Sequence, residues 1–156
     1  MGWHEYYERQ AALDAVVANG LTVPPGFTGE DEVLRALRHR WSLRLAGRVE
    51  LATHEIERDG LDPVDAVAAA WRATAEADAD LRRLLDDHAE HPALRAGALD
   101  EQAMLARAAG LTDPDDGPAE QAAVGAAFLA LLRSGPRRPA RRNPVERLLR
   151  RLVPSA

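Results

Sequence analysis

Residues 30–59 constrain the fold more than any other part of the sequence. They contain no proline, and their apolar side chains recur at intervals of three and four, which places them on one stripe of an α-helix. The stripe consists of Leu34, Leu37, Trp41, Leu45, Val49, Ala52 and Ile56. Gly60 follows where a helix commonly ends. The sequence therefore predicts a helix about 45 Å long with one buried face.

The other segments also carry helix signals. Gly20 closes an apolar-periodic segment, Asp62-Pro63 and Pro92 are typical helix starts, and residues 76–80 break the pattern between two helices. The predicted helices after the break begin near 81, 92 and 118, and the first helix covers 3–19. No segment alternates with a period of two. We therefore expect an all-α fold, an antiparallel bundle of five or six helices, followed by a basic, conditionally ordered C-terminal tail.

The residue types present exclude several kinds of chemistry. There is no Cys and no Lys, so thiolate and Schiff-base mechanisms are excluded. The three serines lie outside any nucleophile elbow, and no glycine-rich phosphate loop is found. An enzyme would have to use Asp, Glu, His and Arg, and no motif supports one. We expect a non-enzymatic protein without cofactors.

The beginning of the sequence and its hydropathy favour a cytoplasmic protein. The start is acidic and has no apolar core of a secretory signal, and no apolar run approaches the roughly 20 residues needed to cross a bilayer. The exclusive use of Arg as the basic residue, with abundant Ala, is typical of a GC-rich bacterial genome. The choice of Arg over Lys is therefore not taken as a sign of phosphate recognition.

The charge is divided unevenly along the chain. Residues 1–132 hold 12 Arg and 24 acidic residues, whereas residues 133–156 hold eight Arg and a single acid, Glu146. Such an asymmetry points to an interaction surface. We divide the chain into an acidic helical domain (1–133), a Pro/Arg linker (134–143) and a short basic amphipathic helix (144–153).

The last of these parts, 144–153, is the predicted docking element. Asn143-Pro144 is a helix start, and the apolar residues that follow fall on one face with arginines opposite. The residues assigned to docking are Arg147, Leu148, Leu149, Arg150, Arg151 and Leu152. Ten residues are too few for a stable isolated helix, so we expect order only where the apolar face meets a surface.

Several partners fit this docking element. Its own acidic body or a second copy is favoured because the linker keeps the segment at high effective concentration. An unidentified protein is the next candidate, and a membrane surface would bind so short a helix weakly. Nucleic acid is disfavoured, because the acidic body would repel phosphates and no recognition motif is found. The sequence thus predicts a protein that acts by protein–protein contact.

Charged residues on the apolar stripe suggest an alternative function. Arg48 falls within the stripe of the long helix, and Glu55 falls on the same side two turns later. A charge there must be paired or must reach solvent. We expect an ion pair of Arg48 with Glu55 or with Glu101; the alternatives are a pocket for a small anion or an oligomer interface.

Three histidines form the second alternative, a metal site. His88 and His91 are three residues apart, and His54 on the long helix could supply a third ligand. The Glu-x-x-His pattern of carboxylate-bridged metal bundles is absent. Partly buried or helix-capping roles are the competing interpretation.

Overall fold

The computed structural model describes residues 2–135, and this part of the chain is helical without a strand. The predicted all-α class is confirmed. The docking element 144–153 and most of the linker lie outside the described residues. The six helices of this described part are α1 (Trp3–Asn19), α2 (Glu30–Asp59), α3 (Pro63–Ala77), α4 (Ala79–Asp87), α5 (Pro92–Ala108) and α6 (Pro118–Ser134).

The helix ends have the physical causes that the sequence indicates. Gly60 ends α2 in the left-handed conformation, at φ 64°, which favours glycine. Asp62 caps α3 by accepting a hydrogen bond from the backbone N–H of Asp65, with Pro63 in the first turn. His91 caps α5 through Nδ1, which accepts from the N–H of Ala93.

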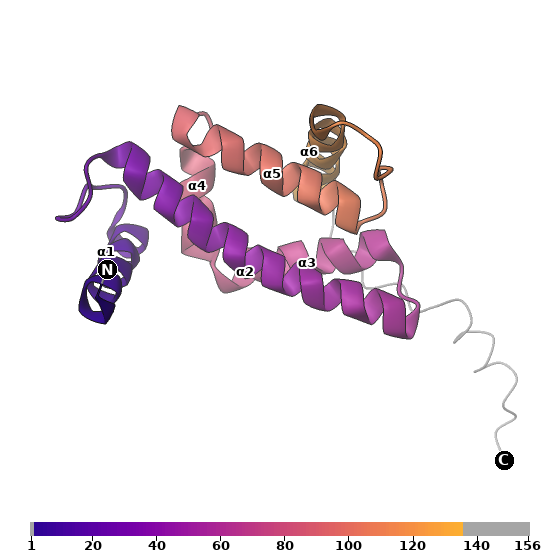
Figure 1. Ribbon diagram of the computed structural model, residues 1–156, viewed down its shortest axis with the longest axis horizontal. Coiled ribbons are helices and arrows are strands. Elements are labelled where there is room, and N and C mark those ends of the chain that lie inside the picture. The colour runs from indigo at the N-terminus through magenta and orange to yellow at the C-terminus, as the bar shows by residue number, and fades with distance from the viewer. Residues whose placement is uncertain (1, 136–156) are drawn as a thin grey trace, which may run out of the picture.

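The long helix α2 is the element against which most of the others pack. Three residues separate α2 from α3, so α3 turns back along the second half of α2. Figure 1 shows α5 running beside α2, with α6 seen nearly end-on against α5 and α1 set apart at one end of the molecule. No helix in the described range is both long and apolar enough to cross a membrane.

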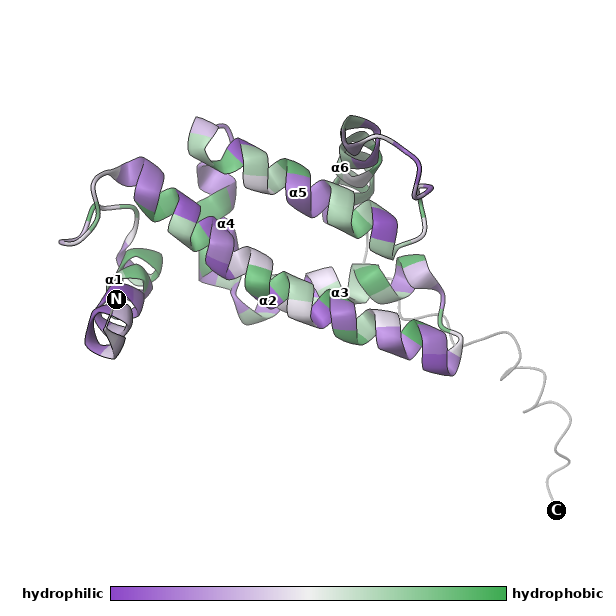
Figure 2. Cartoon of the chain, viewed as in Figure 1, coloured by the Kyte–Doolittle hydropathy of each residue, from purple (hydrophilic) through white to green (hydrophobic). Residues whose placement is uncertain are grey.

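The core lies between α2 and the helices that cover its apolar stripe. The cartoon coloured by hydropathy shows green and purple residues alternating along the ribbon of α2 (Figure 2). Trp41 is fully buried, and Ile56, at the far end of the stripe, is only partly covered. The largest fully buried side chains are Trp41, Leu34, Leu37, Leu45, Leu85 and Leu105.

A glycine sets the distance between α5 and α6. At Gly125 on α6, a Cβ atom would overlap the backbone carbonyl of Gln102 on α5. The backbones of α5 and α6 therefore approach more closely here than a side chain at position 125 would permit.

Candidate functional site

A buried carboxylate, Glu101 of α5, lies at the centre of the polar network in the core. Its Oε2 accepts a hydrogen bond of 2.7 Å from Arg38 Nη2 and another of 2.7 Å from the indole Nε1 of Trp41. Its Oε1 accepts a 3.2 Å bond from Nε1 of Trp71. Three donors from α2 and α3 thus meet one carboxylate, which satisfies the hydrogen-bonding capacity that burial would otherwise leave unmet.

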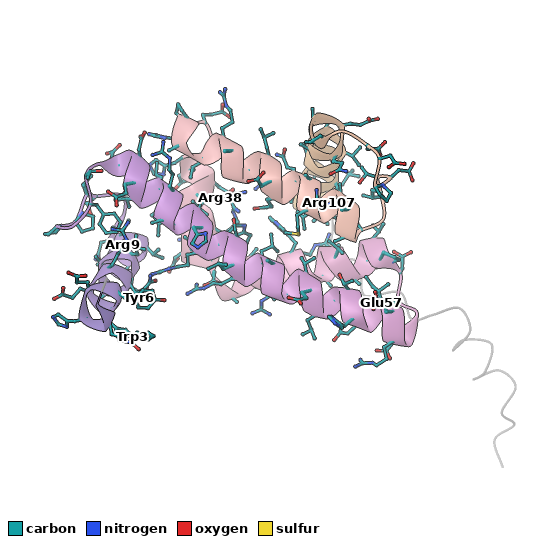
Figure 3. All side chains as sticks on the ribbon, viewed as in Figure 1. Trp3, Tyr6, Arg9, Arg38, Glu57 and Arg107 are labelled. Atoms are coloured by element: carbon teal, nitrogen blue, oxygen red, sulfur yellow. The ribbon has the colours of Figure 1, made fainter. Side chains whose placement is uncertain are left out.

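Arg38 reaches this carboxylate across the packed interface between α2 and α5 (Figure 3). Its Nη2 also donates to the backbone carbonyl of Gly97, at 2.8 Å. A Cβ at Gly97 would lie 2.7 Å from Cγ of Arg38, so the glycine makes room for the arginine stem. Burial lowers the pKa of Arg38, and the charge of Glu101 opposes that effect.

A second arginine, Arg82 of α4, extends the network toward the surface. Its guanidinium lies 4.6 Å from the ring centroid of Trp41 and donates to Asp86 through Nε and Nη2. Asp86 also accepts from Arg133 near the end of α6, whose guanidinium lies 5.7 Å from the ring of Trp71. Each indole therefore lies between the carboxylate of Glu101 and an arginine guanidinium, that of Arg82 for Trp41 and that of Arg133 for Trp71.

This network corrects the predicted pairing of Arg48. Glu101 is buried, but its partner is Arg38, which lies nearly three turns before Arg48 on α2. Arg48 is exposed and forms no ion pair with Glu55. The anion that the buried arginine binds is therefore the carboxylate of Glu101 in the same chain. Arg38 lies on the same stripe, one turn after Leu34 and one turn before Trp41, so its spacing would have marked it as it marked Arg48. Spacing alone does not tell which of the two arginines α5 covers.

Arg48 and Glu55 do line the same surface feature, a groove between α2 and α3 with a volume of about 290 Å³. Its lining includes four alanines of α3, together with Leu51 and Leu61. We call it the α2–α3 groove. Its lining residues are Arg48, Leu51, Ala52, Glu55, Leu61, Asp62, Asp65, Ala66, Ala69, Ala70 and Ala73.

The three histidines proposed as metal ligands are each engaged separately. Nδ1 of His54 bonds to the carbonyl of Glu50, and Nδ1 of His88 bonds to that of Leu84. His91 caps α5 and lies 3.6 Å from Asp31. Within residues 2–135, no three His, Asp or Glu side chains converge as metal ligands would.

A further surface that the sequence pattern did not reveal lies on α1. In the sequence, Trp3 and Tyr6 have the helical spacing that places them on the same side as Leu13 and Val16, yet the two aromatic residues are exposed and the two aliphatic ones are buried. The other helices cover only the second half of α1. Exposed aromatic side chains that contact one another are typical of interaction surfaces.

No protein-family model matches this sequence, no curated protein is significantly similar to it, and no solved structure is significantly similar to its fold.

Proposed function

We propose that this protein acts by protein–protein contact rather than by catalysis, and that its segment 144–153 docks in the α2–α3 groove of the same chain. The observation that carries this proposal is the groove itself, whose lining combines five alanines with three carboxylates near the α2–α3 turn. An apolar recess with an acidic rim is the complement of a basic amphipathic helix.

The apolar residues of 144–153 have the spacing that a groove-bound helix uses. Val145, Leu148, Leu149 and Leu152 stand at positions i, i+3, i+4 and i+7. Helices that dock in grooves anchor themselves with side chains at these positions. The small side chains of the alanines in the lining leave room for the leucines.

The charges of the groove also favour one direction of docking. Arg48 lies at one end, whereas Glu55, Asp62 and Asp65 lie toward the α2–α3 turn. Along the segment, Glu146 and Arg147 come first and offset each other, and Arg150 and Arg151 follow them. The more basic end of the segment therefore lies nearer the carboxylates when the segment runs parallel to α2.

The starting point of the linker supports docking within one chain. Arg133, two residues before the last described residue, lies against Trp71 of α3, the helix that forms one wall of the groove. Residues 136–143 span at most about 28 Å when extended, and α3 with its side chains is about 10–12 Å wide. The linker is long enough to pass around α3, and it holds the segment at an effective concentration on the order of millimolar.

Paramagnetic labelling of the full chain tests this proposal. Because the sequence has no Cys, Ser155→Cys provides a unique site for a spin label just beyond the segment. We expect the amide NMR signals of residues around Glu55 and Asp62 to broaden. Added salt should reduce the broadening, because the charges involved are exposed.

Charge variants provide the matched control. The double variant Glu55→Gln/Asp62→Asn removes two carboxylates of the groove, and Asn preserves the helix cap at position 62. It should abolish most of the broadening, whereas Asp115→Asn, in the exposed α5–α6 connection, should leave it unchanged. Broadening that spares the groove overturns the proposal. Broadening that appears only when a spin-labelled chain is mixed with an isotope-labelled one shows docking on a second copy instead.

A further inference from the structure

The first turns of α1 carry a cluster of exposed aromatic rings. The ring centroid of Trp3 lies 6.4 Å from that of Tyr6 and 6.4 Å from that of Tyr7, and the centroids of the two tyrosine rings are 5.7 Å apart. The exposed fractions are 79% for Trp3, 64% for Tyr7 and 46% for Tyr6. We call these three residues the α1 aromatic cluster; Trp3 and Tyr6 are marked in Figure 3 at the outer end of α1.

The fold does not require these rings for its own core. Leu13 and Val16 anchor α1 to the other helices, and both are almost completely buried. Polar contacts add to this anchoring, with Arg40 bonded to both Gln10 and Asp14. Leaving three large aromatic residues in water is unfavourable, so they point to a contact that lies outside the single chain.

A groove lies directly beside the cluster, between α1 and α2. It has a volume of about 620 Å³, and Tyr6, Leu13, Ala36 and Leu43 provide its apolar lining. Leu43 is 62% exposed and lies off the apolar stripe of α2, so it too is unexplained by the internal packing. We call this recess the α1–α2 groove.

The charges around this groove are balanced. Four arginines line it, and each forms an ion pair with an acid of the same chain. The pairs are Arg9–Glu32, Arg35–Asp31, Arg40–Asp14 and Arg44–Asp78. The groove therefore has no excess of positive charge that would attract nucleic acid or an anionic membrane. For the same reason, its charges do not repel the same surface on a second copy of the chain.

We propose that the α1 aromatic cluster and the α1–α2 groove form a self-association surface, in which Trp3 of each copy enters the groove of the other. Tyr6 belongs to both the cluster and the groove, so protrusion and recess are adjacent on one patch. A two-fold contact needs this arrangement, because each copy presents the same surface to its partner. Partly exposed Arg35 and Arg44 at the rim offer cationic groups to the entering indole.

The surface area that the dimer can bury limits the affinity that we expect. Aromatic side chains bury about 150–250 Å² each, and the exposed fractions of the cluster correspond to roughly 400 Å² per copy. A standard interface buries about 800 Å² per partner, so the groove walls must supply the remainder. We expect a reversible dimer with a dissociation constant on the order of micromolar.

Sedimentation of the full chain over a concentration series tests the proposal. The unsubstituted chain should shift from monomer to dimer through the micromolar range. Trp3→Ala and Leu43→Arg should each raise the dissociation constant about tenfold or more, because one removes the protrusion and the other fills the recess. Leu131→Ala, at a 70% exposed leucine of α6, is the matched control and should change nothing.

A mixture of the two variants tests the geometry. Trp3→Ala keeps its groove and Leu43→Arg keeps its tryptophan, so a mixed dimer retains one contact where each variant alone retains none. The mixture should therefore associate more tightly than either variant. Equal association would overturn insertion of Trp3 into the groove.

Two further outcomes would overturn the proposal as a whole. One is a chain that stays monomeric throughout the series, including one whose tryptophan emission shifts only on vesicles of anionic lipid and does not shift in Trp3→Ala. The other is equal weakening by Trp3→Ala and Leu131→Ala. The proposed dimer should persist at high salt and in the Glu55→Gln/Asp62→Asn variant, so its failure is distinguishable from failure of the docking at the α2–α3 groove.

Discussion

Arg38 on α2 and Glu101 on α5 form an ion pair of 2.7 Å in which both side chains are more than nine-tenths buried. Two indole N–H groups share the same carboxylate. The attraction within such a pair adds little to the net stability of the fold, because burying both charges is unfavourable. Removing one partner is nevertheless strongly destabilising, because the remaining charge stays buried without a partner. The pair therefore fixes how α2, α3 and α5 meet.

Removing the carboxylate should strongly destabilise the protein. We expect Glu101→Leu to lower the free energy of unfolding by about 3–5 kcal/mol, since it leaves Arg38 unpaired. Urea denaturation at 25 °C measures this, with Glu57→Leu on the exposed side of α2 as a control within about 0.5 kcal/mol of the parent. The double variant Arg38→Leu/Glu101→Leu should recover part of the loss. A change below about 1 kcal/mol for Glu101→Leu would contradict a structural role for the pair.

Two glycine substitutions should have effects of opposite sign. Gly125→Ala places a methyl group against the carbonyl of Gln102, so α5 and α6 must separate, and we expect a loss of about 1–3 kcal/mol or more. At Gly47 on α2, an added Cβ meets nothing within 4 Å, so Gly47→Ala should stabilise the helix by up to about 1 kcal/mol. Thermal unfolding of both variants distinguishes them. A stabilising Gly125→Ala would show that the two helices lie further apart.

The cap of α3 gives a third prediction. Asp62 accepts a 3.0 Å hydrogen bond from the N–H of Asp65, so Asp62→Ala should cost about 0.5–2 kcal/mol. Asp62→Asn should retain most of the stability, because an amide oxygen can accept the same bond. Urea midpoints at neutral pH compare the two variants, and equal losses would indicate that the charge, rather than the hydrogen bond, stabilises this helix end.

The helices could be predicted from the sequence because their signals are local. Gly20, Gly60, Pro63 and Pro92 mark ends that depend on the backbone of a few neighbouring residues. The predicted bounds of the long helix, 30–59, agree with α2 in the structure. Period-three-and-four spacing likewise identified which side of this helix is buried.

The site could be predicted only in part, because it depends on where two helices cross. Glu101 could be predicted to pair with an arginine of α2, but which arginine lies opposite is decided by the position of α5 along α2. Arg38 and Arg48 both fall on the apolar stripe of α2, but only Arg38 lies where α5 packs on it, whereas Arg48 lines a groove. Similarly, the alignment of Trp3 with Leu13 gives no sign of how far the neighbouring helices extend along α1.

The contact between α1 and the start of α2 should weaken in acid. Glu32 accepts hydrogen bonds from the backbone N–H of Thr28, from Arg9 and from the hydroxyl of Thr28, which lower its pKa from 4.5 to about 2. Because the pKa is lower in the folded state, the stabilisation is complete above about pH 4.5 and is lost as the pH falls toward 2.

Comparison with a variant isolates this effect. We expect Glu32→Gln to have a lower unfolding midpoint than the parent at neutral pH, and the difference should shrink between pH 4.5 and 2 because the parent loses the same charge there. Glu57→Gln removes an exposed carboxylate from the same helix without removing these hydrogen bonds, so it controls for net charge. Thermal unfolding across pH 2–7 measures both variants. A difference between parent and Glu32→Gln that stayed constant down to pH 2 would show that the Glu32 carboxylate does not hold α1 in place through its charge.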